Sequence, residues 1–115
     1  MNVEEIRLFC LNKTGVTESF PFDDTTLVFK VLNKMFALVN LKDNQNINLK
    51  CDPDKAIELR EHYTSVLPGY HMNKKLWNTI MLDESIPDKI IKEWIDDSYA
   101  LVVATLSKIK QQELH

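Results

Sequence analysis

The hydrophobic pattern of residues 25–51 follows a strand-like period, and this feature most constrains the fold. Three short runs rich in β-branched and aromatic residues lie at 25–32, 35–40 and 46–51. They are separated by the pair Asn33-Lys34 and by a polar stretch at 42–45. Short connections join antiparallel strands, whereas parallel strands need long crossovers. The pattern therefore predicts a three-stranded antiparallel meander.

The register of this meander follows if Asn33 and Lys34 form a two-residue turn, because Leu32 then pairs with Met35. One face of the meander is then strongly apolar and carries Leu27, Phe29, Val31, Phe36, Leu38, Ile47, Leu49 and Cys51. The opposite face is mixed and carries Val28, Lys30, Leu32, Met35, Ala37, Val39, Asn48 and Lys50. In this register Lys30 and Lys50 flank Ala37, which leaves room for an anion between them. Two solvated lysines on an exposed sheet face are the simpler alternative.

Helical patterns lie on both sides of the meander. Asn2 and Glu5 form a capping-box pattern at the start of a first helix, and Gly15 is its expected end. Residues 16–24 are interpreted as a connection held down by aromatic anchors, Phe20 and Phe22. Asp52-Pro53 predicts the start of a second helix that ends before Pro68-Gly69.

Two more strands and a long helix complete the predicted fold. We expect strands at 66–72 and 77–82 around a tight turn at 73–76. Ser85 and Asp88 match a capping pattern ahead of a helix with apolar residues at helical spacing up to Leu106, and residues 108–115 are expected to fray. The prediction is a single α+β domain over residues 1–115. It has two layers, a five-stranded antiparallel sheet covered by helices, in the order α-β-β-β-α-β-β-α.

Composition bounds the function. A chain of 115 residues fits one domain. No apolar run approaches the roughly 18 residues that span a bilayer. We therefore expect no membrane association. Cys10 and Cys51 are isolated, which favours a reduced, cytoplasmic location. The net charge of −3 weighs against strong non-specific nucleic-acid binding but leaves a local basic surface open.

Catalytic and metal signatures are missing from the sequence. His62 and His71 have no ligating partner at the spacing that tetrahedral metal sites use. The chain has two glycines, too few for a phosphate-cradling loop, and it has no Gly-x-Ser-x-Gly elbow. We therefore expect no cofactor, no metal, no small-molecule substrate and no enzymatic activity.

Several segments, taken together and in order, resemble the MmcQ/YjbR family. They are Val28-Phe-Lys-Val31, Lys34-Met-Phe-Ala-Leu38, Leu49-Lys50, Leu67-Pro-Gly-Tyr-His-Met-Asn-Lys74, Leu76-Trp-Asn-Thr79, Leu82-Asp83 and Ser98-Tyr99. The resemblance implies a YjbR-like α+β fold, similar in architecture to secretion chaperones and to frataxin (CyaY-like). It also implies DNA binding, and it supplies no catalytic residues.

A candidate nucleic-acid site combines the lysines of the mixed face with the segment 70–77. In this hypothesis lysines contact phosphates and rings stack on bases, and the residues are Lys30, Lys50, Tyr70, His71, Asn73, Lys74, Lys75 and Trp77. Packing roles for Tyr70 and Trp77, and ordinary turn lysines, are the alternative. A second hypothesis is a protein-interaction domain, an adaptor, chaperone-like module or homodimer, that uses the apolar part of the same face.

Overall fold

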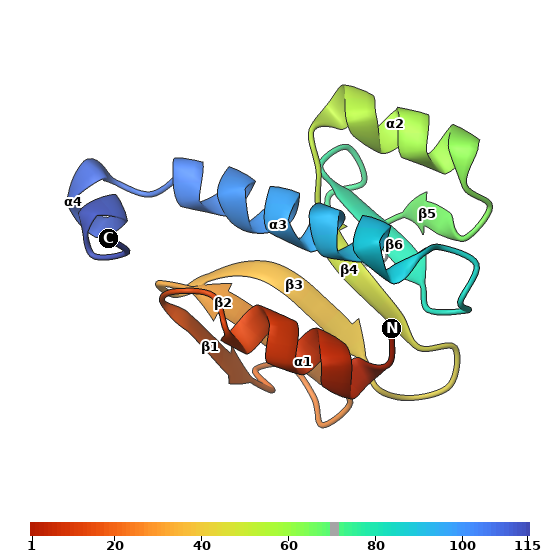
Figure 1. The fold of residues 1–115 in the computed structure, drawn as a ribbon, viewed down its shortest axis with the longest axis horizontal. Helices are drawn as coiled ribbons and strands as arrows, with labels where there is room; N and C mark the ends of the chain where they lie inside the picture. The colour runs from red at the N-terminus through yellow and green to blue at the C-terminus, as the bar shows by residue number, and fades with distance from the viewer. Residues whose placement is uncertain (70–71) are drawn as a thin grey trace.

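The structure, a computed structural model, describes residues 1–69 and 72–115. Its elements are, in chain order, α1 (Val3–Leu11), β1 (Val16–Ser19), β2 (Thr26–Val31), β3 (Lys34–Asn40), β4 (Asn46–Lys50), α2 (Pro53–His62), β5 (Val66–Pro68), β6 (Trp77–Met81), α3 (Asp88–Ala104) and α4 (Lys108–Gln112). All pairings between the described strands are antiparallel, and the sheet order is β1-β2-β3-β4-β6-β5. Figure 1 shows the long helix α3 running across the sheet.

The α+β class is confirmed, but the predicted number of strands is wrong. The described sheet has six strands, because β1 lies in the segment that was interpreted as a connection. Four residues give too short an alternation to predict a strand. They become one because Val16 to Ser19 pair with Val31 to Val28 of β2, which satisfies backbone groups that a loop would leave to water.

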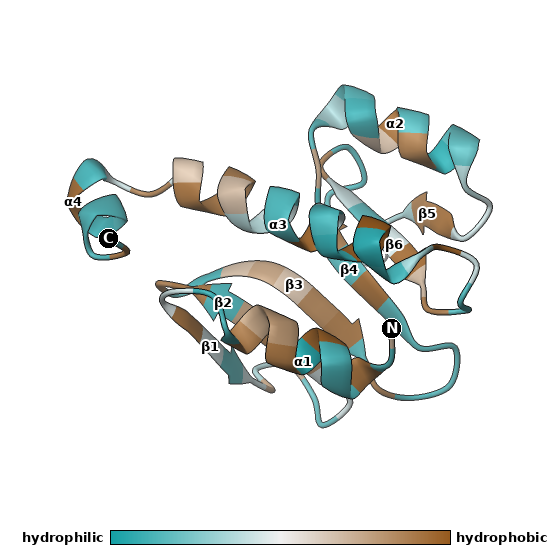
Figure 2. Cartoon of the chain, in the orientation of Figure 1, coloured by the Kyte–Doolittle hydropathy of each residue, from teal (hydrophilic) through white to brown (hydrophobic). Residues whose placement is uncertain are grey.

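Helices cover one face of the sheet and leave the other to solvent and loops. Ile6 and Cys10 of α1 and Ile91, Ile95 and Val102 of α3 share one buried cluster with the strands. The helix α2 lies beside β5 and β6. Figure 2 shows hydrophobic residues along β3 and a mostly hydrophilic α4. One main core between sheet and helices therefore carries the hydrophobic stabilisation.

The β2–β3 hairpin differs from the predicted register. The turn residues are Leu32 and Asn33, both with positive φ (45° and 72°), so Val31 pairs with Lys34. A bulge then shifts the register, because Phe29 pairs with Ala37 while Lys30 pairs with Met35, which leaves Phe36 as the extra residue.

This bulge reverses the predicted faces for the second half of β3. Ala37 and Val39 belong to the main core, and Leu38 lies on the opposite face with Val28. The predicted row of Lys30, Ala37 and Lys50 is therefore wrong. Sequence alternation could not reveal the change, because a bulge shifts the period by one residue without any glycine or proline to mark it.

Two of the three predicted helix caps are present in the structure, and one is not. The capping box of Asn2 and Glu5 and the Asp52 cap of α2 are confirmed. The Ser85 cap is wrong: α3 begins after Pro87, and the Ser85 hydroxyl donates to Asp83 Oδ1 at 2.6 Å instead. α1 ends at Leu11, and Gly15, at φ +75°, makes the turn into β1.

Two further boundaries and one loop also differ. β5 ends at Pro68 rather than at residue 72, and α4 forms within the tail that was expected to fray. Phe20 and Phe22 are 48% and 64% exposed, so they are not anchors for the β1–β2 loop. Asp23 holds that loop, since its Oδ1 accepts the Thr25 and Thr26 N–H groups, and these bonds lower the pKa of its carboxyl group.

Candidate nucleic-acid interface

The sheet face opposite the helices, here called the open face, carries the candidate residues of the strands. Strand pairing places on it Thr17, Ser19, Thr26, Val28, Lys30, Met35, Leu38, Asn40, Asn46, Asn48, Lys50, Leu67, Trp77, Thr79 and Met81. The charged members of this set are Lys30 and Lys50, and both are cations. Lys30 pairs with Met35, and Lys50 pairs with Trp77 on β6. The described strand positions of the open face therefore carry positive charge without acidic neighbours.

The centre of the open face is apolar and already packed. Val28, Leu38 and Trp77 form a second buried cluster, against which Met35, Met72 and Leu76 pack. Trp77 is 8% exposed. Its indole ring lies in this cluster and is not presented for stacking on a base, so the packing alternative for this residue is the one that the structure favours.

Residues 72–76, here called the lysine turn, lead into β6 and carry three more candidates. Lys74 and Lys75 are exposed. Asn73 is occupied structurally: its Oδ1 accepts the Lys75 N–H at 2.9 Å, and its carbonyl accepts the Trp77 N–H at 2.9 Å. Tyr70 and His71, the remaining candidates, lie outside the described residues.

Three cations on the helix side are paired with carboxylates. On the helix side, Arg7 pairs with Glu18 at 2.7 Å, Lys13 with Asp96, and Lys55 with Asp97 at 3.1 Å. The hydrogen bond to Glu18 raises the pKa of Arg7, and the bond to Asp97 raises the pKa of Lys55. In the part of the chain that the structure describes, the candidate lysines have no carboxylate partner. These are Lys30, Lys50, Lys74 and Lys75.

Arg60 is a cation that the sequence reasoning missed. Its Nε donates to Asn78 Oδ1 at 2.7 Å, and one of its terminal nitrogens donates to the carbonyl of Lys74. The signal that could have found it is Asn78 of β6. This asparagine pairs with Leu49 and lies two residues before Ile80, and both of these residues face the core. A polar residue at a core position requires a partner, and Arg60 provides it.

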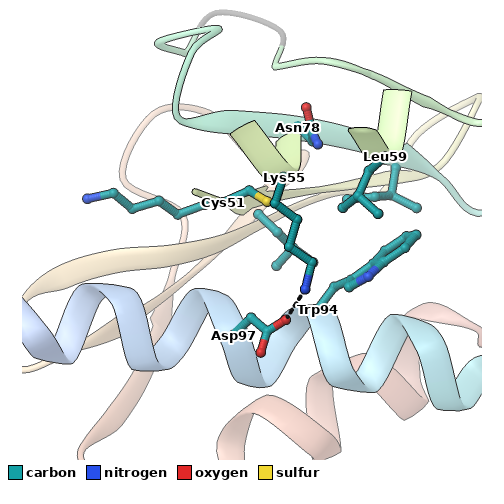
Figure 3. A pocket seen from close by; sticks show the side chains of 9 residues that line it. Cys51, Lys55, Leu59, Asn78, Trp94 and Asp97 are labelled. Atoms are coloured by element: carbon teal, nitrogen blue, oxygen red, sulfur yellow. Dashed lines mark hydrogen bonds and ion pairs between the residues drawn. The ribbon is translucent and has the colours of Figure 1, made fainter. Parts of the chain in front are cut away.

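A pocket lies between α2, α3 and the ends of β4 and β6 (Figure 3). Leu59 and Trp94 supply apolar lining, and the Lys55–Asp97 ion pair also lines the pocket. Cys51 also lines it, and burial raises the pKa of the Cys51 thiol. This disfavours the thiolate, which is the nucleophilic form, so the pocket has no activated nucleophile at Cys51.

The described residues contain no group of three or more His, Cys, Asp or Glu side chains placed to hold a metal ion. None of their helices combines the length and apolar character needed to cross a bilayer.

Comparison with known proteins places this arrangement in a family. The YjbR family model matches residues 11–101. The chain is 40% identical to the uncharacterized protein YbdF of Escherichia coli O157:H7 over 112 residues, which cover 96% of this chain and 92% of YbdF. It is 34% identical to the uncharacterized protein YjbR of Escherichia coli K12 over 115 residues, which cover 99% and 98% of the two chains.

Two crystal structures share the fold. The Deinococcus radiodurans protein DR2400, with a DUF419 domain, matches with a TM-score of 0.91 and 42% identity over 98% of this chain and 87% of that protein. A Pseudomonas syringae protein matches with a TM-score of 0.78 and 27% identity over 88% and 98% of the two chains. The sequence matches and the shared fold agree, and the chain belongs to the YjbR family.

Proposed function

We propose that the protein is a non-enzymatic binding module that contacts the phosphates of DNA with the lysines of the open face and of the lysine turn. One observation carries the proposal. Arg7, Lys13 and Lys55 on the helix side are paired with carboxylates, whereas within the described residues Lys30, Lys50, Lys74 and Lys75 of the open face and the lysine turn are not. Cations without acidic partners keep their full attraction for a polyanion.

The geometry favours contacts with the backbone of DNA over readout of its bases. Lysine is a point charge that binds phosphate without selecting a base. Trp77 lies in the apolar cluster, which removes it as a stacking platform. The net charge of the chain is −3, so the rest of its surface repels a polyanion. Binding should therefore be modest, non-specific and strongly dependent on salt.

A protein-interaction role is the second candidate, and the apolar centre of the open face favours it. Met35, Met72 and Leu76 are only partly buried around Val28 and Leu38. Methionine side chains adapt to different partners, and a protein or a second copy of this chain could cover them. Two further predictions are compatible with this role. They are a cytoplasmic location and an architecture similar to secretion chaperones and frataxin.

Salt dependence separates the two candidates. The experiment measures the anisotropy of a labelled DNA duplex with the protein at about 50 mM and about 200 mM salt. The wild type should bind at the lower concentration and weaken steeply at the higher one. Lys74→Ala/Lys75→Ala should flatten the slope of log affinity against log salt by about 1 for each lysine.

The matched control is Lys89→Ala/Lys92→Ala, which removes the same charge from α3 on the helix side. It should leave the slope nearly unchanged. If both double variants changed the salt slope equally, the slope would report the net charge of the protein and not contacts made by the lysine turn. Absence of binding at the lower salt would remove the DNA proposal, and a salt-insensitive self-association in sedimentation would then support the protein-interaction role.

A further inference from the structure

The lysine turn is fixed at its C-terminal end by its own backbone. The Asn73 carbonyl accepts the N–H groups of Leu76 and Trp77 at 3.1 and 2.9 Å. The Leu76 carbonyl accepts the Cys51 N–H at 2.7 Å, which ties the turn to the end of β4. The Lys74 carbonyl is bound differently, because its donor is the guanidinium group of Arg60 from α2.

Arg60 is itself held in place from the buried side. Its Nε donates to Asn78 Oδ1 at 2.7 Å, and Asn78 is only 1% exposed. The Asn78 amide donates in turn to the Ala56 carbonyl of α2 at 3.3 Å. A continuous chain of hydrogen bonds therefore runs from the α2 backbone through β6 to the backbone of Lys74.

This chain needs the geometry of arginine. Two nitrogens of one planar guanidinium reach two acceptors, Asn78 Oδ1 and the Lys74 carbonyl, in a fixed relative orientation. A lysine ammonium is a single point and does not reproduce the planar fork. Among the described residues Arg60 also lacks a carboxylate partner, whereas Arg7 pairs with Glu4 and Glu18. Its charge therefore stays available beside Lys74 and Lys75.

We infer that Arg60 is a positioning residue for polyanion binding: it fixes the backbone of the lysine turn so that Lys74 and Lys75 are presented together. The inference rests on the proposed DNA-binding function, but the effect of Arg60 on the turn does not require DNA. A preorganised turn pays less ordering entropy when phosphates bind, so loss of the fork weakens affinity without removing a charge.

The test uses Arg60→Lys, which keeps the charge and removes the fork. Arg7→Lys is the matched control, because Arg7 also binds through Nε and a terminal nitrogen but lies on α1. Amide hydrogen exchange is measured in the free protein at Lys75, Leu76 and Trp77. In Arg60→Lys these amides should exchange about tenfold faster, which corresponds to one lost charge-assisted hydrogen bond. Amides of β3 should keep their wild-type rates in both variants.

Duplex affinity supplies the second readout. Arg60→Lys should weaken binding several-fold while the salt slope stays at its wild-type value, since the number of cations is unchanged. The inference would be overturned if Arg60→Lys kept the wild-type exchange rates at the turn. It would also be overturned if the wild type bound duplex and Arg60→Lys bound it with the same affinity. If the wild type does not bind duplex at all, the proposed function fails, and with it the role of Arg60 in binding, whatever the exchange rates show.

Discussion

The Ser98 hydroxyl of α3 donates to the carbonyl of Phe36 at 2.6 Å, across 62 residues of sequence. The same oxygen accepts the Lys50 N–H at 2.9 Å. The pairing of β3 and β4 begins with Ala37 and Leu49, one residue beyond each of these backbone groups. Ser98 therefore takes the place of a sheet hydrogen bond beside the bulge and fixes the end of β4 from which Lys50 projects.

Replacing Ser98 with alanine should destabilise the fold by about 2 kcal/mol, because two backbone groups lose their buried partner. Urea denaturation followed by circular dichroism measures the change. Ser19→Ala is the control: Ser19 is an exposed serine on β1, and its loss should shift the free energy of unfolding by less than about 0.5 kcal/mol. Equal stabilities of the two variants would show that the bulge is satisfied without Ser98.

Gly69→Ala should destabilise the β5–β6 pair. A Cβ at this position would lie 2.8 Å from Trp77 Cβ and 2.9 Å from the Trp77 carbonyl oxygen, so the backbone would have to move. Overpacking of this kind costs about 1–3 kcal/mol. The measurement is again urea denaturation, with Lys75→Ala as a nearby exposed control. A Gly69→Ala variant as stable as the wild type would mean that the hairpin relaxes without loss.

Lys30→Ala/Lys50→Ala should reduce the salt slope of duplex binding by up to about 1 for each lysine. Trp77→Phe should leave the slope unchanged, because Trp77 carries no charge and is buried in the cluster with Leu38 and Val28. Fluorescence anisotropy of labelled duplex over a salt series gives both slopes. A control pair on α4, Lys108→Ala/Lys110→Ala, removes the same charge elsewhere. A large loss of affinity in Trp77→Phe with stability retained would contradict the backbone-contact mechanism.

Stability should fall at alkaline pH because of Cys10. Burial raises the pKa of its thiol from the ordinary value of 9.0 to about 12. Between these values the unfolded chain has lost the proton and the folded chain keeps it, so rising pH favours unfolding. The slope for one such group is about 1.4 kcal/mol per pH unit.

Urea midpoints at pH 8 and about pH 10.5 test this prediction. Cys10→Ala should lower stability at pH 8, because it leaves a small cavity, but it should lose less on going to the higher pH. Cys51→Ala keeps Cys10 and should retain most of the wild-type loss. Parallel pH profiles for the wild type and Cys10→Ala would contradict the assignment.

The outcome for individual elements shows which signals the sequence contains. The capping box at Asn2 and the Asp52-Pro53 start were predictable, because helix caps depend on residues within one turn of each other. The cap assigned to Ser85 failed, because α3 begins at Asp88 with Pro87 at its cap position, and Ser85 belongs to the preceding turn, where it donates to Asp83. Phe20 and Phe22 were expected to anchor a loop, but they are exposed, and the hydrogen bonds of Asp23 hold the chain there.

For the candidate site, the sequence identified the unpaired lysines but not what supports them. Lys74 and Lys75 were identified as candidates because they are adjacent in a predicted turn. The roles of Arg60 and Ser98 depend on hydrogen bonds across 14 to 62 residues, and no local pattern reports such contacts. The burial of Trp77 was one of two alternatives, and only its cluster with Val28 and Leu38 decides between them.

The sequence by itself determined the α+β class, the strand-like period of residues 25–51 and the positions of three of the helices, because helix and strand periods and most caps are local properties of the chain. Tertiary structure alone decided the strand β1, the bulge at Phe36 and therefore which side chains of β3 face outward. A short edge strand and a one-residue shift gain their stability from hydrogen bonds and packing with distant segments, and those energies are absent from any local stretch of sequence.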